Sequence, residues 1–378
     1  MTPFGRLLLA SCACLPLLAA PVAARAALFG REGLDPFFCK MPSVRQTVVY
    51  VDDTMMVDGQ TDWARKLAGK LRASLAPGER VTLVRLSPTT GQSSELWSGC
   101  WPGYSAAQRA DFSGRSFLFS RNPLTDLADQ QKYFLGDLGQ ALTAIYESAR
   151  RSPDAVAVDA GHPPRKELIR ALASDEGRFA ASRVTVRAIL YSDMAENSDL
   201  GSVFSGTAPD DLGHRLGTWL RRGVFYAFGS GADVTGDVRF PEQARAFWLT
   251  VLHGMAATLD GIGSDLNVPN LIPVAAHDYP VLLDIDRQEL EGRISLLTDD
   301  EGDLVDSWIG ISRLGSTGLD GTFRCAHARC RLEAATDTGL ATNAASEQLV
   351  LQGPASGPLS GQLGVRAQGM SFPLHTED

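Results

Sequence analysis

Between residues 44 and 260, short β-branched runs alternate with longer stretches whose apolar residues recur every three or four positions. The run 47–54 is the clearest of the short ones, and it ends in two carboxylates and a hydroxyl. Leu67, Leu71 and Leu75 illustrate the helical spacing. This alternation predicts a doubly wound, mostly parallel sheet covered by helices on both faces. We expect strands at 47–52, 80–86, 94–97, 183–191 and 223–228, and helices at 62–75, 124–151, 166–173, 212–220 and 241–259.

The pattern changes after residue 260. Residues 261–279 are rich in Gly, Pro and Asn, which predicts a linker. The short alternating runs beyond it have the spacing of a β-sandwich or barrel, and we expect a small sandwich-like domain at 280–378. The α/β domain then covers 44–260. The expected strands of the second domain are 281–285, 293–297, 304–311, 318–325, 330–335, 348–351 and 359–365.

The N-terminus has the features of an export signal. Arg6 precedes an apolar stretch at 7–22, and Ala24-Arg25-Ala26 is a small-x-small cleavage site, so residues 1–26 are expected to be a signal peptide followed by an arm at 27–43. A lipoprotein signal modified at Cys12 is the alternative, but its apolar core would be short. No later stretch has the roughly 18 apolar residues of a membrane helix. We expect a periplasmic or secreted protein without a transmembrane segment.

Charge limits the classes of partner. The chain has 35 basic and 44 acidic residues, and loss of Arg6 and Arg25 with the signal would leave 33 basic residues and a net charge of −11. An acidic protein of this kind is not expected to bind nucleic acid or anionic lipid as its main partner.

Four cysteines would remain in the mature chain, an even number in an oxidising compartment. They allow three pairings, and proximity favours Cys325 with Cys330, which leaves Cys39 with Cys100. The alternative is a zinc site at Cys325 and Cys330 with His327, which lacks a second pair of ligands.

Polar residues follow two of the expected strands. Asp52-Asp53-Thr54 ends the first, and Ser192-Asp193 ends the strand at 183–191. Together with the alternation of strands and helices, this arrangement over residues 44–260 resembles the von Willebrand factor A-type fold. Members of that family often bind a divalent cation through Asp-x-Ser-x-Ser after the first strand, a Thr in a middle loop and a late Asp.

The resemblance implies a metal site at Asp52, Thr54 and Asp193, with Mg²⁺ or another divalent cation that accepts a carboxylate from a partner. Two positions depart from the family pattern. Met56 stands in place of the second Ser, and residues 136–142 resemble the Thr-x-Thr-Gly-x-Ala-Leu segment with Gly136 in place of the Thr. The alternative is that the polar residues of the first strand end cap the next helix and that Asp193 closes a turn.

An enzyme was weighed against a binding protein. A haloacid-dehalogenase-type phosphatase would use Asp52 as nucleophile, but its general acid would be at position 54, which is Thr. Phosphate-loop and nucleophile-elbow motifs are absent, and the histidines show no zinc-protease spacing. The acidic run 299–303 lacks the calcium-loop spacing and predicts a hairpin turn with Gly302 at positive φ.

We therefore expect a non-enzymatic protein that binds another protein of the cell envelope through the strand ends. Asp53 and Ser192 would contribute to that binding surface. Trp97, Trp101 and Tyr104 lie close to Cys100 in the sequence, where they would either contact the partner or pack against the disulfide. A metal-independent structural scaffold is the alternative function.

Overall fold

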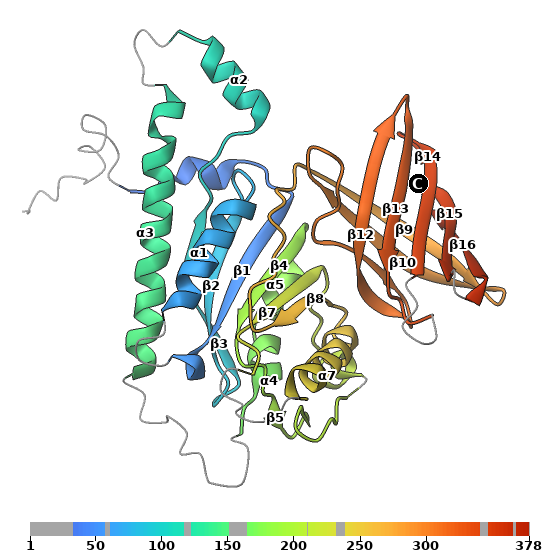
Figure 1. The fold of residues 1–378 in the computed structure, drawn as a ribbon, viewed down its shortest axis with the longest axis horizontal. Helices are drawn as coiled ribbons and strands as arrows, with labels where there is room; N and C mark the ends of the chain where they lie inside the picture. The colour runs from blue at the N-terminus through green and yellow to red at the C-terminus, as the bar shows by residue number, and fades with distance from the viewer. Residues whose placement is uncertain are drawn as a thin grey trace, which may run out of the picture.

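The computed structural model describes residues 33–56, 61–116, 122–150, 165–209, 211–231, 239–340, 347–365 and 368–377. The predicted signal peptide, including Cys12, lies outside these residues. The chain forms an α/β domain followed by a β-barrel that packs against it (Figure 1).

The α/β domain is built on a six-stranded sheet in the order β3-β2-β1-β4-β7-β8. All neighbouring strands are parallel except β2 and β3, which form an antiparallel hairpin. Every residue of β4 and β7 is buried, as expected for parallel strands covered on both faces. The strands are β1 (Arg45–Asp52), β2 (Arg80–Ser87), β3 (Gln92–Cys100), β4 (Thr185–Tyr191), β7 (Gly223–Phe228) and β8 (Thr258–Gly263).

Alternate side chains of β1 enter two separate cores, as the period of two in a strand requires. Val49 and Val51 pack under α1 (Asp62–Ser74) and α3 (Pro123–Arg150). Val48 and Tyr50 pack against the helices of the other face. These are α4 (Leu168–Ala173), α5 (Glu176–Ala181), α6 (Leu212–Leu216) and α7 (Phe240–Gly254).

Several small elements complete this domain. The short helix η2 (Pro36–Lys40) belongs to the predicted N-terminal arm, and η3 (Asp53–Met55) follows β1 directly. α2 (Ala106–Gly114) begins with a capping box formed by Ser105 and Gln108. The two-residue strands β5 (Asn197–Ser198) and β6 (Gly201–Ser202) pair with each other near the end of β4.

The second domain is a closed eight-stranded barrel, which corrects the predicted sandwich. The eighth strand, β16 (Met370–Thr376), was missed because Pro373 interrupts its pattern, and it closes the barrel by pairing with both β15 and β9. Gly302 has a φ of +86°, which confirms the turn after β10. The other strands are β9 (Ala275–Ile285), β10 (Gln288–Thr298), β11 (Ser307–Ile311), β12 (Gly315–Ala326), β13 (Arg329–Thr336), β14 (Glu347–Pro354) and β15 (Ser360–Val365).

The predicted linker is largely part of the α/β domain. Helix α7 ends at Gly254, and the chain then forms β8, whose first residues had been assigned to the helix. Residues 264–274 run along α1, and Leu266 and Val268 are buried in the core beneath it. The two domains are therefore joined by a packed segment.

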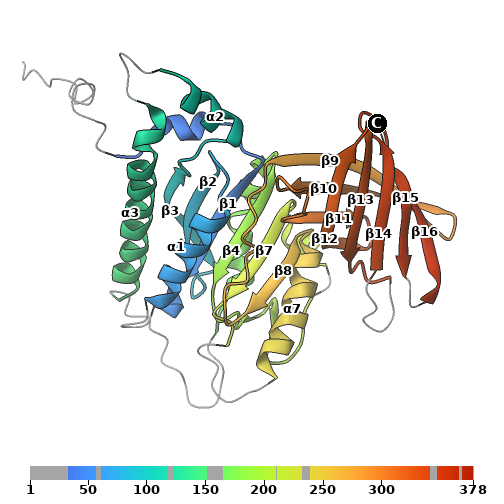
Figure 2. The same cartoon turned by 45° about the horizontal axis from the view of Figure 1, so that its top comes forward.

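The barrel packs against the amino-terminal ends of β1, β4 and β7 (Figure 2). Asp306, just before β11, accepts hydrogen bonds from Arg45 of β1 and from Tyr226 of β7. The ring of Trp308 belongs to the core of the α/β domain, where its Nε1 donates to Thr185 Oγ1 at 3.4 Å. Side chains of the barrel thus complete the interior of the first domain.

Glycines allow strand β12 to approach the α/β domain closely. A Cβ atom added to Gly318 would lie 2.7 Å from Asp260 Oδ1, and one added to Gly315 would overlap the ring of His253. A side chain at position 315 would also be strained because φ is +83° there, and one at position 318 would displace the carboxylate of Asp260. In the described ranges, no helix is both long and apolar enough to span a membrane.

Candidate functional site

The polar residues at the carboxyl ends of β1 and β4 form one buried cluster, which we call the strand-tip site. β1 and β4 are parallel neighbours, with Val51 opposite Tyr191, so Asp52 and Ser192 follow side by side. This is the end of the sheet where ligands bind in open α/β folds. The barrel contacts the opposite end of the same strands.

Asp52 is fully buried and accepts hydrogen bonds at both carboxylate oxygens. Its Oδ1 accepts from the backbone nitrogen of Thr54 at 3.0 Å and from Thr54 Oγ1 at 2.7 Å. Its Oδ2 accepts from Ser192 Oγ at 2.7 Å. The bonds to Thr54 cap η3, which matches the alternative that the carboxylate caps the following turn.

Lys166 places an ammonium group between the two aspartates. Its Nζ lies 2.7 Å from Asp52 Oδ2 and 2.5 Å from Asp193 Oδ1. Asp193 Oδ1 also accepts from the backbone nitrogen of Ala195, as expected for an aspartate that closes a turn. The sequence had placed Lys166 at the start of a helix and assigned it no role.

Hydrogen bonds also hold the backbone of Lys166. Its amide donates to the carbonyl of Asn197 at 3.0 Å, and the amide of Asn197 donates back at 2.9 Å. Burial by itself lowers the pKa of the Lys166 ammonium, but Asp52 and Asp193 outweigh burial and raise that pKa above its usual value. The lysine is therefore held in place and charged.

The residues in this arrangement do not fit a resident divalent cation. Mg²⁺ binds oxygen ligands at about 2.0–2.1 Å, whereas the point between Asp52 and Asp193 holds a nitrogen. Met56 offers no oxygen, and Gly136 lies on the exposed face of α3, where an added Cβ would meet no atom within 4 Å. Among the described residues, no group of three or more His, Cys, Asp or Glu is placed to hold a metal ion.

The remaining polar residues predicted for this site have separate partners. Ser192 is buried and links Asp52 to the backbone nitrogen of Met194. Asp53 accepts from Ser87 Oγ of β2 at 2.6 Å, and burial raises the pKa of its carboxyl. Ser192 therefore belongs to the strand-tip site, whereas Asp53 is bound to the neighbouring strand.

The aromatic residues near Cys100 pack inside the fold. Trp101 and Tyr104 are buried, and Trp97 is partly buried. The rings of Trp97 and Trp101 both contact Phe134 of α3 edge-on, with centroids 5.1 Å apart. Tyr104 packs against Phe38 of η2. These contacts agree with the packing interpretation of the cluster.

Both favoured cysteine pairs are disulfides in the structure. Cys39 of η2 is bonded to Cys100 of β3, and Cys325 to Cys330 across the β12–β13 hairpin. The second bond excludes the zinc site weighed for Cys325, His327 and Cys330, because a disulfide sulfur is not a thiolate ligand.

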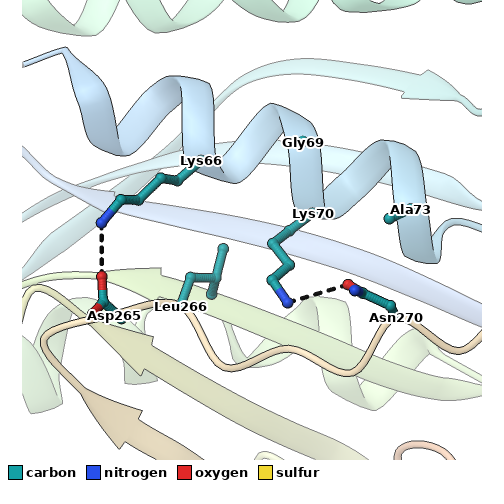
Figure 3. Close-up of a pocket in the computed structure, with 7 residues that line it drawn as sticks. All are labelled: Lys66, Gly69, Lys70, Ala73, Asp265, Leu266 and Asn270. Carbon is teal, nitrogen blue, oxygen red and sulfur yellow. Dashed lines mark hydrogen bonds and ion pairs between the residues drawn. The ribbon is translucent and has the colours of Figure 1, made fainter.

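A groove lies between α1 and the segment 264–274 (Figure 3). Its volume is about 340 Å³. Lys66 Nζ lies 2.7 Å from Asp265 Oδ1, and Lys70 Nζ lies 3.1 Å from Asn270 Oδ1. Both lysines of the groove therefore bind the segment that connects the domains.

Glu196 is a buried acid that the sequence did not single out. It lies just after the strand-tip site, where its Oε2 accepts from the Ile169 amide at 2.9 Å and its Oε1 from Ser198 Oγ at 2.5 Å. Burial raises the pKa of its carboxyl from 4.5 to about 7. The folded protein thus keeps this proton in a pH range where the unfolded chain has lost it.

Replacing Glu196 with glutamine is expected to stabilise the protein above neutral pH. An acid whose pKa is raised by folding stabilises the folded protein fully at pH values below its unfolded pKa of 4.5. This stabilisation is lost as the pH rises towards about 7. Glu196→Gln should raise the free energy of unfolding at pH 8 by up to about 3 kcal/mol, with little difference at pH 4.5. Urea unfolding at the two pH values measures this.

Glu301→Gln is the matched control, because Glu301 is exposed in the turn after β10. It should give the same stability difference at both pH values. A Glu196→Gln variant that is equally or less stable than the native protein at pH 8 would contradict the prediction.

No protein-family model matches the chain, and a search of curated proteins finds no match. The solved structures that match the chain include two that cover most of its length. The ArnB paralog VWA2 from Sulfolobus acidocaldarius is 10% identical with a TM-score of 0.32, over 82% of this chain and 65% of that one. The human COPII-coat protein Sec24c is 8% identical with a TM-score of 0.33, over 89% of this chain and 44% of that one. The chain spans less than two thirds of the length of either protein.

Proposed function

We propose that this chain is an exported, non-catalytic scaffold that binds another protein of the bacterial cell envelope. In this proposal its α/β domain is of the von Willebrand factor A type, and its strand-tip site holds no metal. The sheet order, with β1 at the centre and an antiparallel edge strand, supports that relationship. The acids at the ends of β1 and β4 support it as well.

The observation that carries the proposal is the bridge from Asp52 through Lys166 to Asp193. A metal-dependent adhesion domain needs an open cation that accepts a carboxylate from its partner. Here both carboxylates are paired with one lysine of the same chain, and the side chains of Asp52, Lys166 and Asp193 are all at most 8% exposed. The same burial argues against Asp52 as a catalytic nucleophile, which would have to reach a substrate.

The junction of the two domains also favours a scaffold. Buried charges and the ring of Trp308 hold the barrel against the sheet, so surfaces on both domains keep a constant relative position. A partner that contacts both domains would then bind without the entropy cost of ordering them.

Affinity capture with and without a chelator tests the proposal. The tagged full chain is cross-linked in intact cells and recovered from the envelope fraction in the presence or absence of EDTA. We expect the same envelope partners in both samples. Loss of the partners with EDTA would instead support metal-mediated adhesion, and turnover of a phosphoester that disappears in Asp52→Asn would overturn the non-catalytic assignment.

Export is tested separately by the mass of the mature protein. Cleavage by signal peptidase after Ala26 should give a chain that begins at Ala27. A lipid-modified Cys12 would replace this assignment with a lipoprotein, and recovery of the uncleaved chain from the cytoplasm would contradict an envelope function.

A further inference from the structure

We propose that Lys166 is the resident cation of the strand-tip site and that removal of its side chain converts the site into one that binds a divalent cation. The inference deepens the proposed function, because it names what replaces the metal. It can fail or succeed independently of any partner, since the site is tested on the purified protein.

The first argument is the position of the charge. Asp52 Oδ2 and Asp193 Oδ1 both point at one atom, Lys166 Nζ, at 2.7 and 2.5 Å. Two carboxylates that converge on one point are what a hard divalent cation requires, with water as the remaining ligands. Ser192 Oγ, bound to the same oxygen of Asp52, adds a neutral oxygen beside that point.

The second argument is the way the lysine is presented. An adventitious surface ion pair is held by two mobile side chains, as between Lys66 and Asp265, where both are more than 60% exposed. Lys166 instead has both its backbone amide and carbonyl bonded to Asn197, and its side chain is 6% exposed. The chain therefore delivers the ammonium into the site from a fixed point, so that it is part of the fold.

The third argument is the number of oxygen ligands. Met56 and Gly136 offer no side-chain oxygen to a cation, and Gly136 lies on the exposed face of α3. A single positive charge with three N–H donors needs fewer oxygen partners than a divalent ion does. The oxygens of Asp52 and Asp193 are therefore sufficient for Lys166.

Metal-dependent thermal unfolding of Lys166→Ala tests the proposal. Alanine removes the ammonium together with its stem, which leaves two buried carboxylates without a counter-ion and space for an ion with its water ligands. The variant should melt below the native protein, and Mn²⁺ or Mg²⁺ at about 100-fold above its Kd should raise its Tm by about 5 °C. The native protein should show no rise with either metal, and Na⁺ at equal ionic strength should not replace them.

Two control variants locate the effect. Lys166→Ala combined with Asp193→Asn has the same space but a single carboxylate, so the rise in Tm with metal should be lost. Lys66→Ala removes a cation of the same type from the exposed ion pair with Asp265, and its Tm should show no rise with metal.

If Lys166→Ala does not fold alone, refolding it with and without Mn²⁺ gives the same answer, since folded protein should appear only with the metal. A rise in Tm of the native protein with millimolar Mn²⁺ would overturn the proposal. It would also be overturned if Lys166→Ala showed no gain in Tm or in refolding yield with metal.

Discussion

Removing the carboxylate of Asp306 is expected to lower the free energy of unfolding by about 3–5 kcal/mol, because it leaves one buried positive charge unbalanced. Arg45 and Arg187 are both fully buried in the α/β domain, and Glu79 is the acid of that domain that pairs with them. Asp306 is the second acid, and it comes from the barrel. In Asp306→Ala two arginines would share one carboxylate.

The change should also weaken the coupling between the domains. Asp306 binds Arg45 and Tyr226, so its loss removes contacts that connect the barrel to two strands of the sheet. Unfolding in urea should then separate into two transitions, one for each domain, instead of the single transition expected of the native protein. Circular dichroism and tryptophan fluorescence of the full chain follow the two steps.

Asp303→Ala is the control, since Asp303 lies three residues earlier in an exposed ion pair with Arg324 and should cost less than about 1 kcal/mol. A double variant sharpens the test. Arg45→Met with Asp306→Leu leaves Arg187 and Glu79 as a balanced pair. The double variant should therefore lose less free energy of unfolding than the two single variants together, by about 2 kcal/mol. If Asp306→Ala lowered the free energy of unfolding no more than Asp303→Ala does, the buried charges would not be what holds the two domains together.

The α/β domain could be predicted from the sequence because its signals are local. Parallel strands buried on both faces appear as continuous apolar runs, and β4 and β7 are of this kind. The cysteine pairing was also predicted, since nearness in sequence favoured Cys325 with Cys330. Closure of the barrel was not, because β16 pairs with β9 across about 90 residues and no local pattern specifies that contact.

The cation of the strand-tip site illustrates a second limit. The sequence places Asp52 and Asp193 at strand ends, but it does not show that Lys166 reaches them, since that depends on the pairing of its backbone with Asn197. A physical signal was nevertheless present. Two buried carboxylates need a counter-charge, and Met56 and Gly136 offer no oxygen to a metal, which favours a cation from the chain itself.

The segment 264–274 was misjudged for a related reason, and Trp308 illustrates the same limit. The composition of that segment is typical of a linker, but Leu266 and Val268 fill a core beneath α1. Trp308 lies in a barrel strand and yet completes the interior of the other domain. Hydrophobic patterns show which residues are buried within an element, and they do not show in which domain that burial occurs.

Loss of the disulfide between Cys39 and Cys100 is expected to cost about 4 kcal/mol, and loss of the one between Cys325 and Cys330 about 2 kcal/mol. The difference arises because a crosslink stabilises mainly by limiting the unfolded chain, and more so for a longer loop. The two bonds close loops with sequence separations of 61 and 5 residues. The longer loop contains β1, α1 and β2, so its crosslink restrains the centre of the sheet.

Urea unfolding of Cys39→Ala/Cys100→Ala and of Cys325→Ala/Cys330→Ala measures the two losses, with alanine chosen so that no new polar group is buried. The first variant should also loosen the cluster of Phe38 and Tyr104, because η2 is then held to β3 by packing alone. Reduction of the native protein should reproduce the sum of the two losses, since the bonds lie in different domains. If both variants lost the same free energy of unfolding, loop entropy would not explain the effect of the two disulfides. The short β12–β13 hairpin would then depend on its disulfide for native contacts.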